Sequence, residues 1–294
     1  MDWILLSLIA AVLLGIYDLC KKHAVGGNAV LPVLFISNLA SATVWLVLMA
    51  MERQLPEILH LQPLDLRGHL FLAGKSFLVG TCWIFAYFAL KHLPVSIAGP
   101  VRSTSPLFTL LGAVLIFHES PTPQQWLGIL ITLGGFILLS TAGKKEGIVF
   151  HKDRWIAFLI VATLLGAGSA LYDRFLLGRA GYTPATVQAW FSIYLVVFFA
   201  PFALGWRLNW WPRGVFHWRW SIPAIGLMLL LTDFVYFMAL ADPDAMVSIV
   251  TSLRRGSVLV VFAGGILLFK ERNIRAKLAP TLLILAGIIT LVTG

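Results

Sequence analysis

Long apolar runs, separated by short polar gaps, fill nearly the whole chain of 294 residues. A helix that crosses a bilayer needs about 20 mostly apolar residues. The chain offers ten such runs, and most charged residues lie in the gaps between them. We therefore predict an all-α integral membrane protein with ten transmembrane helices. The expected helices are 3–22, 29–50, 68–90, 94–117, 122–141, 155–177, 183–205, 217–240, 245–269 and 274–293.

One stretch of the chain occurs twice, at a constant offset of 152 residues. The copies run over 95–119 and 247–271 without a gap, and they share Val, Ser, Ile, Arg, Ser, Phe and Glu. A repeat of this length is typical of membrane carriers built from two related halves. We predict the halves at 1–145 and 146–294. Because each half holds an odd number of helices, the second half must be inverted in the membrane.

The composition agrees with a membrane protein and says little of other partners. Hydrophobic residues make up 59% of the chain, charged residues 12%, and the mean hydropathy is +0.89. Soluble domains carry about 25% charged residues. The net charge of +9 indicates basic residues that flank membrane segments, not a nucleic-acid partner. The expected partners are the lipid bilayer and a small-molecule substrate, and a homodimer is left open.

The distribution of lysine and arginine predicts the orientation, because cytoplasmic gaps carry an excess of both. Fourteen of these residues follow odd-numbered expected helices and four follow even-numbered ones. This count places the first set in the cytoplasm and both termini outside. The four are Arg53, Arg67, Arg174 and Arg179.

Three arginines, Arg102, Arg254 and Arg255, lie inside expected helices. A charge near the bilayer centre costs about 2.5–3.5 kcal/mol on insertion scales, so such a residue faces a wet cavity or a partner. Guanidinium matches carboxylate or phosphate in a bidentate way. We predict that Arg102 and Arg254, which the duplication pairs, bind an anionic substrate, with Ser103 and Ser257 beside them. The alternative is a structural ion pair with Asp18, Asp173 or Asp233.

Backbone breakers lie close to these arginines. Pro100 and Pro106 should kink the expected helix 94–117, and Gly256 should loosen the expected helix 245–269. Carriers place substrate sites at such breaks, so we expect the three residues to permit gating. The alternative is a kink that only improves packing.

A carboxylate and three aromatic residues are candidates for the pocket. Asp233 lies deep in the expected helix 217–240, one turn from Tyr236, and Trp83 and Tyr87 share a face of the expected helix 68–90. We expect them to shape the substrate pocket. The alternative is that the aromatic residues are core or lipid contacts.

Other charged residues are assigned to coupling or to structure. Asp18, Asp173 and Arg255 are candidates for coupling to a proton or counter-substrate, or for an ion pair, although neighbouring basic residues favour an interfacial location for the two aspartates. We interpret Lys75 as a side chain that extends outward to the membrane surface. Glu119 is expected to accept from backbone amides of the helix that follows it.

The chain lacks the constellations of soluble enzymes. It has no phosphate-binding Gly loop with Lys-Ser/Thr, no HExxH and no GxSxG. Cys20 and Cys82 lie in apolar segments, and no histidine pairs with another ligand at metal-site spacing. We therefore expect no enzyme, no metal and no cofactor.

The two halves resemble the EamA repeats of the drug/metabolite transporter superfamily. The resemblance is strongest over 89–135 and 239–287, where a Val-Ser-Ile-(x)-Arg-(x)-Ser run precedes a long apolar helix, a glutamate and a Gly-rich helix. It implies secondary transport of a small metabolite through a central cavity. It also implies cytoplasmic termini, contrary to the lysine and arginine count. The helices implied around the cavity are 3–22, 68–90, 94–117, 155–177, 217–240 and 245–269.

Together these features predict a secondary-active transporter that moves a small anionic metabolite across the bacterial inner membrane by alternating access. Two alternatives stay open, a flippase for lipid-linked substrates and an exporter of cationic drugs.

Overall fold

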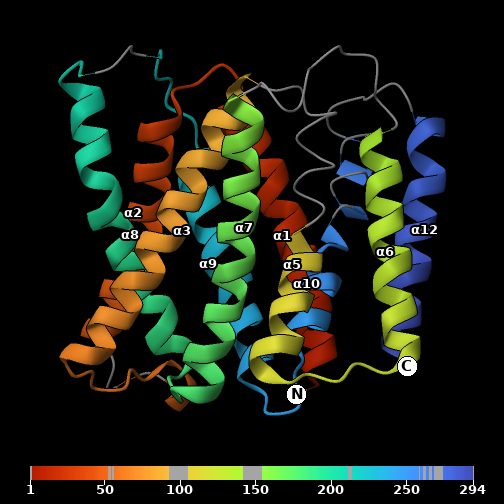
Figure 1. Cartoon of the computed structure of the whole chain (residues 1–294). Coiled ribbons are helices and arrows are strands. Elements are labelled where there is room, and N and C mark those ends of the chain that lie inside the picture. Colours follow the sequence, from red (N-terminus) through yellow and green to blue (C-terminus); the bar gives the residue numbers. More distant parts are fainter. Residues whose placement is uncertain are drawn as a thin grey trace.

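The computed structural model describes residues 2–51, 54, 56–92, 105–141, 154–210, 214–257, 259–260, 263–264, 267 and 274–293. Within these ranges the regular structure is entirely helical (Figure 1). The elements are α1 (Trp3–Val25), α2 (Val30–Ala50), η2 (Glu57–Leu59), α3 (Leu66–His92), α5 (Ser105–Gly112), η3 (Ala113–Phe117), α6 (Pro123–Thr141), α7 (Arg154–Arg174), η4 (Phe175–Arg179), α8 (Pro184–Arg207), α9 (Ser221–Ala241), α10 (Val247–Arg254) and α12 (Ile274–Thr293).

Six helices in the described part of the chain are long and apolar enough to cross a membrane: α1, α2, α3, α7 with η4, α8 and α9. Two shorter apolar helices cover Leu107–Phe117 and Leu278–Leu291. Large apolar side chains such as Leu46 and Leu115 point outward, 54% and 75% exposed. Outward leucines are unfavourable in water and suit a lipid surface. The predicted class, an all-α membrane protein, is confirmed.

Local sequence explains where several helices start. Asp2 accepts a hydrogen bond from the backbone N–H of Ile4 at 2.9 Å and so caps α1. Thr183 caps α8 through the N–H of Thr186, and Pro184 occupies the first turn, where its missing N–H costs nothing. These signals agree with the expected starts of both helices to within a residue.

Helices distant in sequence pack as neighbours. Helix α1 lies against α9, α3 against α7 and α8, and α2 against α8 and α9. Helices α6 and α12 pack on each other at one side of the bundle (Figure 1). Glycines permit this close approach, since a Cβ at Gly135 would meet the backbone N of Ile284 at 2.9 Å and one at Gly287 would meet that of Thr132 at 2.6 Å.

Both chain termini lie at the same end of the bundle (Figure 1). Helix α10 begins at this end of the structure and stops at Arg254, after which Arg255 and Gly256 form a turn. The turn lies where the sequence predicts a loosened helix. A role of Gly256 in gating stays a prediction.

Glu119 does cap a helix, but not the one that follows it. Its carboxylate accepts from the N–H of Val247 at 2.7 Å and of Ser248 at 3.3 Å, and from the Ser248 hydroxyl at 2.7 Å. These are the first residues of α10, which lies more than 120 positions further along the chain. The expectation that Glu119 caps the next helix is wrong, because Thr122 caps α6: its hydroxyl accepts from the N–H of Gln125 at 3.1 Å.

A charged cavity inside the bundle

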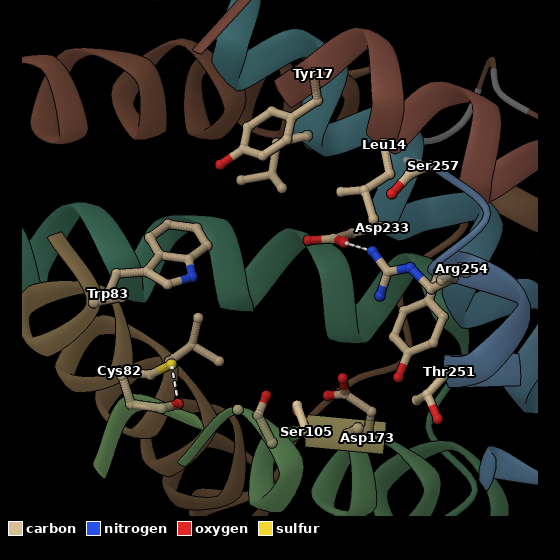
Figure 2. Close-up of a pocket in the computed structure, with 18 of the residues that line it drawn as sticks. Leu14, Tyr17, Cys82, Trp83, Ser105, Asp173, Asp233, Thr251, Arg254 and Ser257 are labelled. Atoms are coloured by element: carbon tan, nitrogen blue, oxygen red, sulfur yellow. Dashed lines mark hydrogen bonds and ion pairs between the residues drawn. The ribbon is translucent and has the colours of Figure 1, made fainter. Parts of the chain in front are cut away.

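A cavity of about 280 Å³ lies inside the bundle. Its walls come from α1, α3, α5, α7, α9 and α10, with Phe191 of α8 and Ser257 beyond α10. Along α3 it extends from Lys75 to Tyr87, which is about 18 Å at 1.5 Å per residue. Figure 2 shows Trp83 on one wall and Arg254 on the opposite one. The cavity therefore brings together both predicted halves of the chain.

Arg254 forms an ion pair with Asp233 in the cavity (Figure 2). Its Nη2 donates to Asp233 Oδ1 at 3.0 Å, and its guanidinium carbon lies 3.9 Å from the centre of the Tyr236 ring. The two paired side chains are 18% and 13% exposed. The Nε of Arg254 is buried and has no hydrogen-bond partner within the described residues. Arg254 is thus held in place while part of its donor edge stays unused.

Lys75 forms a second ion pair, with Asp173. The ammonium donates to Asp173 Oδ1 and lies 4.4 Å from the ring centre of Phe191 and 4.7 Å from that of Phe237. The paired side chains are only 2% and 6% exposed. The interpretation of Lys75 as outward-reaching is wrong, and so is the interfacial location of Asp173. Both side chains point inward, where each neutralises the other.

Arg174, the residue after Asp173, points toward the end of α9. Arg174 donates to the backbone carbonyls of Leu240 at 2.8 Å, Asp242 at 2.9 Å and Pro243 at 3.0 Å. These are carbonyls at and beyond the end of α9, where a cation is favourable. Basic neighbours therefore do not show that an aspartate is interfacial, because successive residues of a helix face different surroundings.

One end of the cavity is closed by apolar packing. A cluster of buried side chains, which we call the closing cluster, lies toward the end where α3 begins and α9 finishes. Tyr236 and Phe237 belong both to this cluster and to the cavity wall. Its other members include Leu72, Leu176, Leu177, Val187, Leu240, Val247 and Val250.

Lys21 and Asp18 lie on the cavity wall nearer the other end of the bundle. The Lys21 ammonium is 4.9 Å from the ring centre of Tyr87 and 5.5 Å from that of Tyr17. The described cavity wall carries four basic and three acidic side chains, a net charge of +1. These are Lys21, Lys75, Arg254 and Arg255 against Asp18, Asp173 and Asp233.

A second cavity, of about 400 Å³, adjoins the first and shares Lys21 and Tyr87 with it. We call it the apolar chamber. It lies where α1 ends, α2 begins and α8 ends. Its apolar wall includes Val25, Val30, Leu31, Leu34, Ile84, Phe88 and Trp206.

The structure places most of the predicted site residues in the charged cavity. Three of them, Pro100, Arg102 and Ser103, lie outside the described residues. Pro106 is the second residue of α5. The predicted residues on the cavity wall are Asp18, Trp83, Tyr87, Asp173, Asp233, Tyr236, Arg254, Arg255 and Ser257.

The sequence interpretation missed Lys75 and Lys21 as cavity residues. Lys75 carries the same signal as Arg254, a cation inside an apolar run. Its carboxylate partner is 98 positions away, so no local pattern connects the two. Within the described ranges, no group of three or more His, Cys, Asp or Glu residues could hold a metal ion.

Apolar spanning helices around a buried, charged cavity are the features of a multi-pass membrane transporter. Residues 1–141 match the EamA-like transporter family. The chain belongs to this family, which is part of the drug/metabolite transporter superfamily and is not an enzyme class.

Curated relatives and a solved structure agree with this assignment. Two relatives, from Salmonella paratyphi B and Salmonella typhimurium, carry the name "Probable 4-amino-4-deoxy-L-arabinose-phosphoundecaprenol flippase subunit ArnE". Each is 35% identical to this chain over 78 residues, which are 26% of this chain and 70% of the relative. A crystal structure matches with a TM-score of 0.77 at 17% identity, over 98% of this chain and 95% of the other, which shows a common fold.

Proposed function

We propose that this protein is a secondary-active transporter that moves a small anionic metabolite across the bacterial inner membrane by alternating access. The observation that carries the proposal is Arg254, a partly accessible guanidinium inside the bundle with unused donors. Arg102 is proposed as its counterpart in the first half, on the basis of the duplication alone.

The donor geometry of Arg254 favours an oxyanion. A guanidinium has five N–H donors, and the described carboxylate contact of Arg254 uses one nitrogen, Nη2. A carboxylate or phosphate in the cavity could accept from the guanidinium N–H groups that Asp233 leaves unused, because both anions match the guanidinium geometry. The net charge of +1 on the described wall favours one negative charge in the ligand.

The size and lining of the cavity favour a small ligand. Ligand pockets typically measure about 300–1,000 Å³, and this one is at the low end. Trp83, Tyr87 and Tyr236 supply ring surfaces, and Ser257 and Thr251 supply hydroxyls. We propose that these side chains select a metabolite with one anionic group and a compact body.

The pattern of helix packing supports ten helices in two inverted halves, at 1–145 and 146–294. If α1, α2, α3 and α5 correspond to α7, α8, α9 and α10, three main contacts between the halves have matching contacts. The pair α1 with α9 matches α7 with α3, α2 with α9 matches α8 with α3, and α1 with α10 matches α7 with α5. A two-fold axis in the membrane plane relates halves in this way.

Such symmetry provides the two states that alternating access needs. The closing cluster seals one end, and the lysine and arginine count assigns the other end to the cytoplasm. The described state is then closed toward the outside. Asp18 and Arg255 remain proposed coupling residues for a proton or counter-substrate, and for Asp173 we propose the alternative role, an ion pair with Lys75. Pro100, Pro106 and Gly256 remain the proposed gating residues.

A binding screen with an arginine variant tests this function. The purified protein is heated with amino acids, organic acids, phosphorylated metabolites and cationic drugs, because a ligand stabilises the state it binds. We expect anions to stabilise the wild type and Arg254→Gln to weaken their binding about 10- to 100-fold, the loss of a charged hydrogen bond. Arg67→Gln is the matched control, since Arg67 is exposed at the start of α3 and lies outside the cavity.

The screen also has outcomes that contradict the proposal. Equal anion binding by Arg254→Gln and the wild type would refute an anion site at Arg254. Stabilisation by cations alone would favour a drug exporter. For any anion that binds, uptake into proteoliposomes loaded with the same anion then measures exchange across the membrane.

A second candidate function is transport of a lipid-linked substrate. The name of the Salmonella relatives, a flippase subunit for a sugar on phosphoundecaprenol, favours it. It predicts that only anions with a long apolar tail are carried. Exchange of a short anion such as a phosphorylated metabolite would contradict this candidate and leave the first one standing.

A further inference from the structure

Apart from Lys21 and Tyr87, which line both cavities, the apolar chamber has a lining different from that of the charged cavity. Its lining comes from branched aliphatic side chains of α1 and α2, with Ile84 and Phe88 of α3 and the Trp206 indole. Asn28 is among its few polar residues, and its side-chain amide already donates to the backbone carbonyls of Ala24 and His217. An apolar wall of this kind favours a hydrocarbon ligand.

The chamber lies at the level where spanning helices end, so it is close to the surface of a bilayer. Gly27 in the turn after α1 is exposed, and the Phe88 side chain is 38% exposed. A spanning helix ends near the boundary between hydrocarbon and headgroups. Lipid chains are therefore expected next to the outer side of the chamber.

Lys21 stands where the two cavities meet. Its ammonium contacts the rings of Tyr17 and Tyr87, and among the described residues no carboxylate forms an ion pair with it. Tyr87 also lines both cavities. An anion beside Lys21 would thus have a charged cavity on one side and an apolar chamber on the other.

We infer that the apolar chamber binds the hydrocarbon chain of a membrane lipid whose anionic headgroup lies at Lys21. The inference rests on the proposed anion-binding function of the charged cavity, and it adds a substrate class, anions that carry a chain. Charge complementarity at Lys21, and the fact that Lys21 and Tyr87 line both cavities, support one ligand that occupies both. The headgroup satisfies the ammonium, and the chain removes apolar surface of the chamber from contact with water.

This arrangement makes affinity depend on chain length. Measured against the ligand free in water, each buried methylene contributes about fourfold in affinity until the chamber is full, after which further methylenes add nothing. Inorganic phosphate, which has no chain, would use only the charged cavity. Chain-length dependence is therefore a property of the chamber, and phosphate binding is a property of the arginine site.

The experiment uses the full chain in lipid nanodiscs and n-alkyl phosphates of increasing length, each with a terminal bromine. Bromine quenches nearby tryptophan fluorescence, and Trp206 lies in the chamber wall. The signal of interest is the quenching that disappears in Trp206→Phe. Leu31→Trp fills the chamber, and Leu46→Trp is the matched control, a 54% exposed residue on the same helix.

We expect Trp206-dependent quenching at low concentrations of the longer alkyl phosphates, weakened at least tenfold by Leu31→Trp and by Lys21→Gln and unchanged by Leu46→Trp. Partition into the nanodisc lipid also quenches the other tryptophans, including one introduced at position 31 or 46, so each variant is compared with the same variant that also carries Trp206→Phe. Brominated alcohols of equal length should bind more weakly, because they lack the charge.

Two results would overturn the inference while leaving the proposed function intact. One is Arg254-dependent binding of phosphate or short anions with no Trp206-dependent quenching at any chain length. The other is equal Trp206-dependent quenching in Leu31→Trp and Leu46→Trp. That result would mean that the chains lie in the bilayer and not in the chamber. If the wild type binds no anion at all, the proposed function itself is refuted.

Discussion

The two ion pairs of the charged cavity have similar chemistry but different surroundings. Lys75 and Asp173 are 2% and 6% exposed and join α3 to α7, one helix from each proposed half. Arg254 and Asp233 are 18% and 13% exposed and join α10 to α9 within the second half. A sealed pair cannot change partners without opening the bundle, whereas an accessible pair can share its cation with a ligand. We therefore propose that burial distinguishes the structural pair, Lys75 with Asp173, from the pair that binds a ligand, Arg254 with Asp233.

The largest effect is expected at the sealed pair. Lys75→Ala leaves the Asp173 carboxylate alone inside the bundle, which should lower the free energy of unfolding by about 3–5 kcal/mol. Replacing both partners with apolar residues, as in Lys75→Met with Asp173→Leu, should restore most of that loss. Thermal unfolding in detergent measures both. If Lys75→Ala is no less stable than Arg254→Ala, the contrast between a sealed and an accessible pair is wrong.

At the accessible pair we expect a smaller effect, a gain in anion affinity instead of a loss of stability. Asp233 competes with an anionic ligand for Arg254, so Asp233→Asn should strengthen anion binding by about tenfold, or 1.4 kcal/mol. Titration of the anion found in the screen measures this. Asp244→Asn is the control, because Asp244 is exposed and lies outside the cavity, and it should leave binding unchanged. Weaker binding by Asp233→Asn would show that Asp233 contacts the substrate directly.

The smallest effect concerns the helix that carries Arg254. Glu119→Ala removes the cap of α10 and should cost about 1 kcal/mol in stability, with Glu119→Gln losing less because an amide oxygen can still accept. Anion binding should weaken slightly, since α10 positions Arg254. Glu57→Gln, at an exposed residue of η2, serves as the control. An unchanged melting temperature for Glu119→Ala would mean that water replaces the cap.

Part of the candidate site could be predicted from sequence. Trp83 and Tyr87 were expected on one helix face, and both line the cavity. Asp233 and Arg254 were each singled out as charges inside apolar runs, and the ion pair considered as an alternative is present. For Lys75 the same signal was interpreted as an outward-reaching side chain, because the sequence does not show which way a helix face turns.

The sequence by itself determined the class of this protein and the positions of six long apolar helices, because the length of an apolar run and the residues that cap it are local properties. It also determined that charges sit inside those runs. Only the tertiary structure decided which charges meet, that Glu119 caps α10 and that an apolar chamber adjoins the charged cavity. Pairing depends on how each helix is rotated about its axis and which helix it packs against, and such contacts join residues as far apart as Lys75 and Asp173.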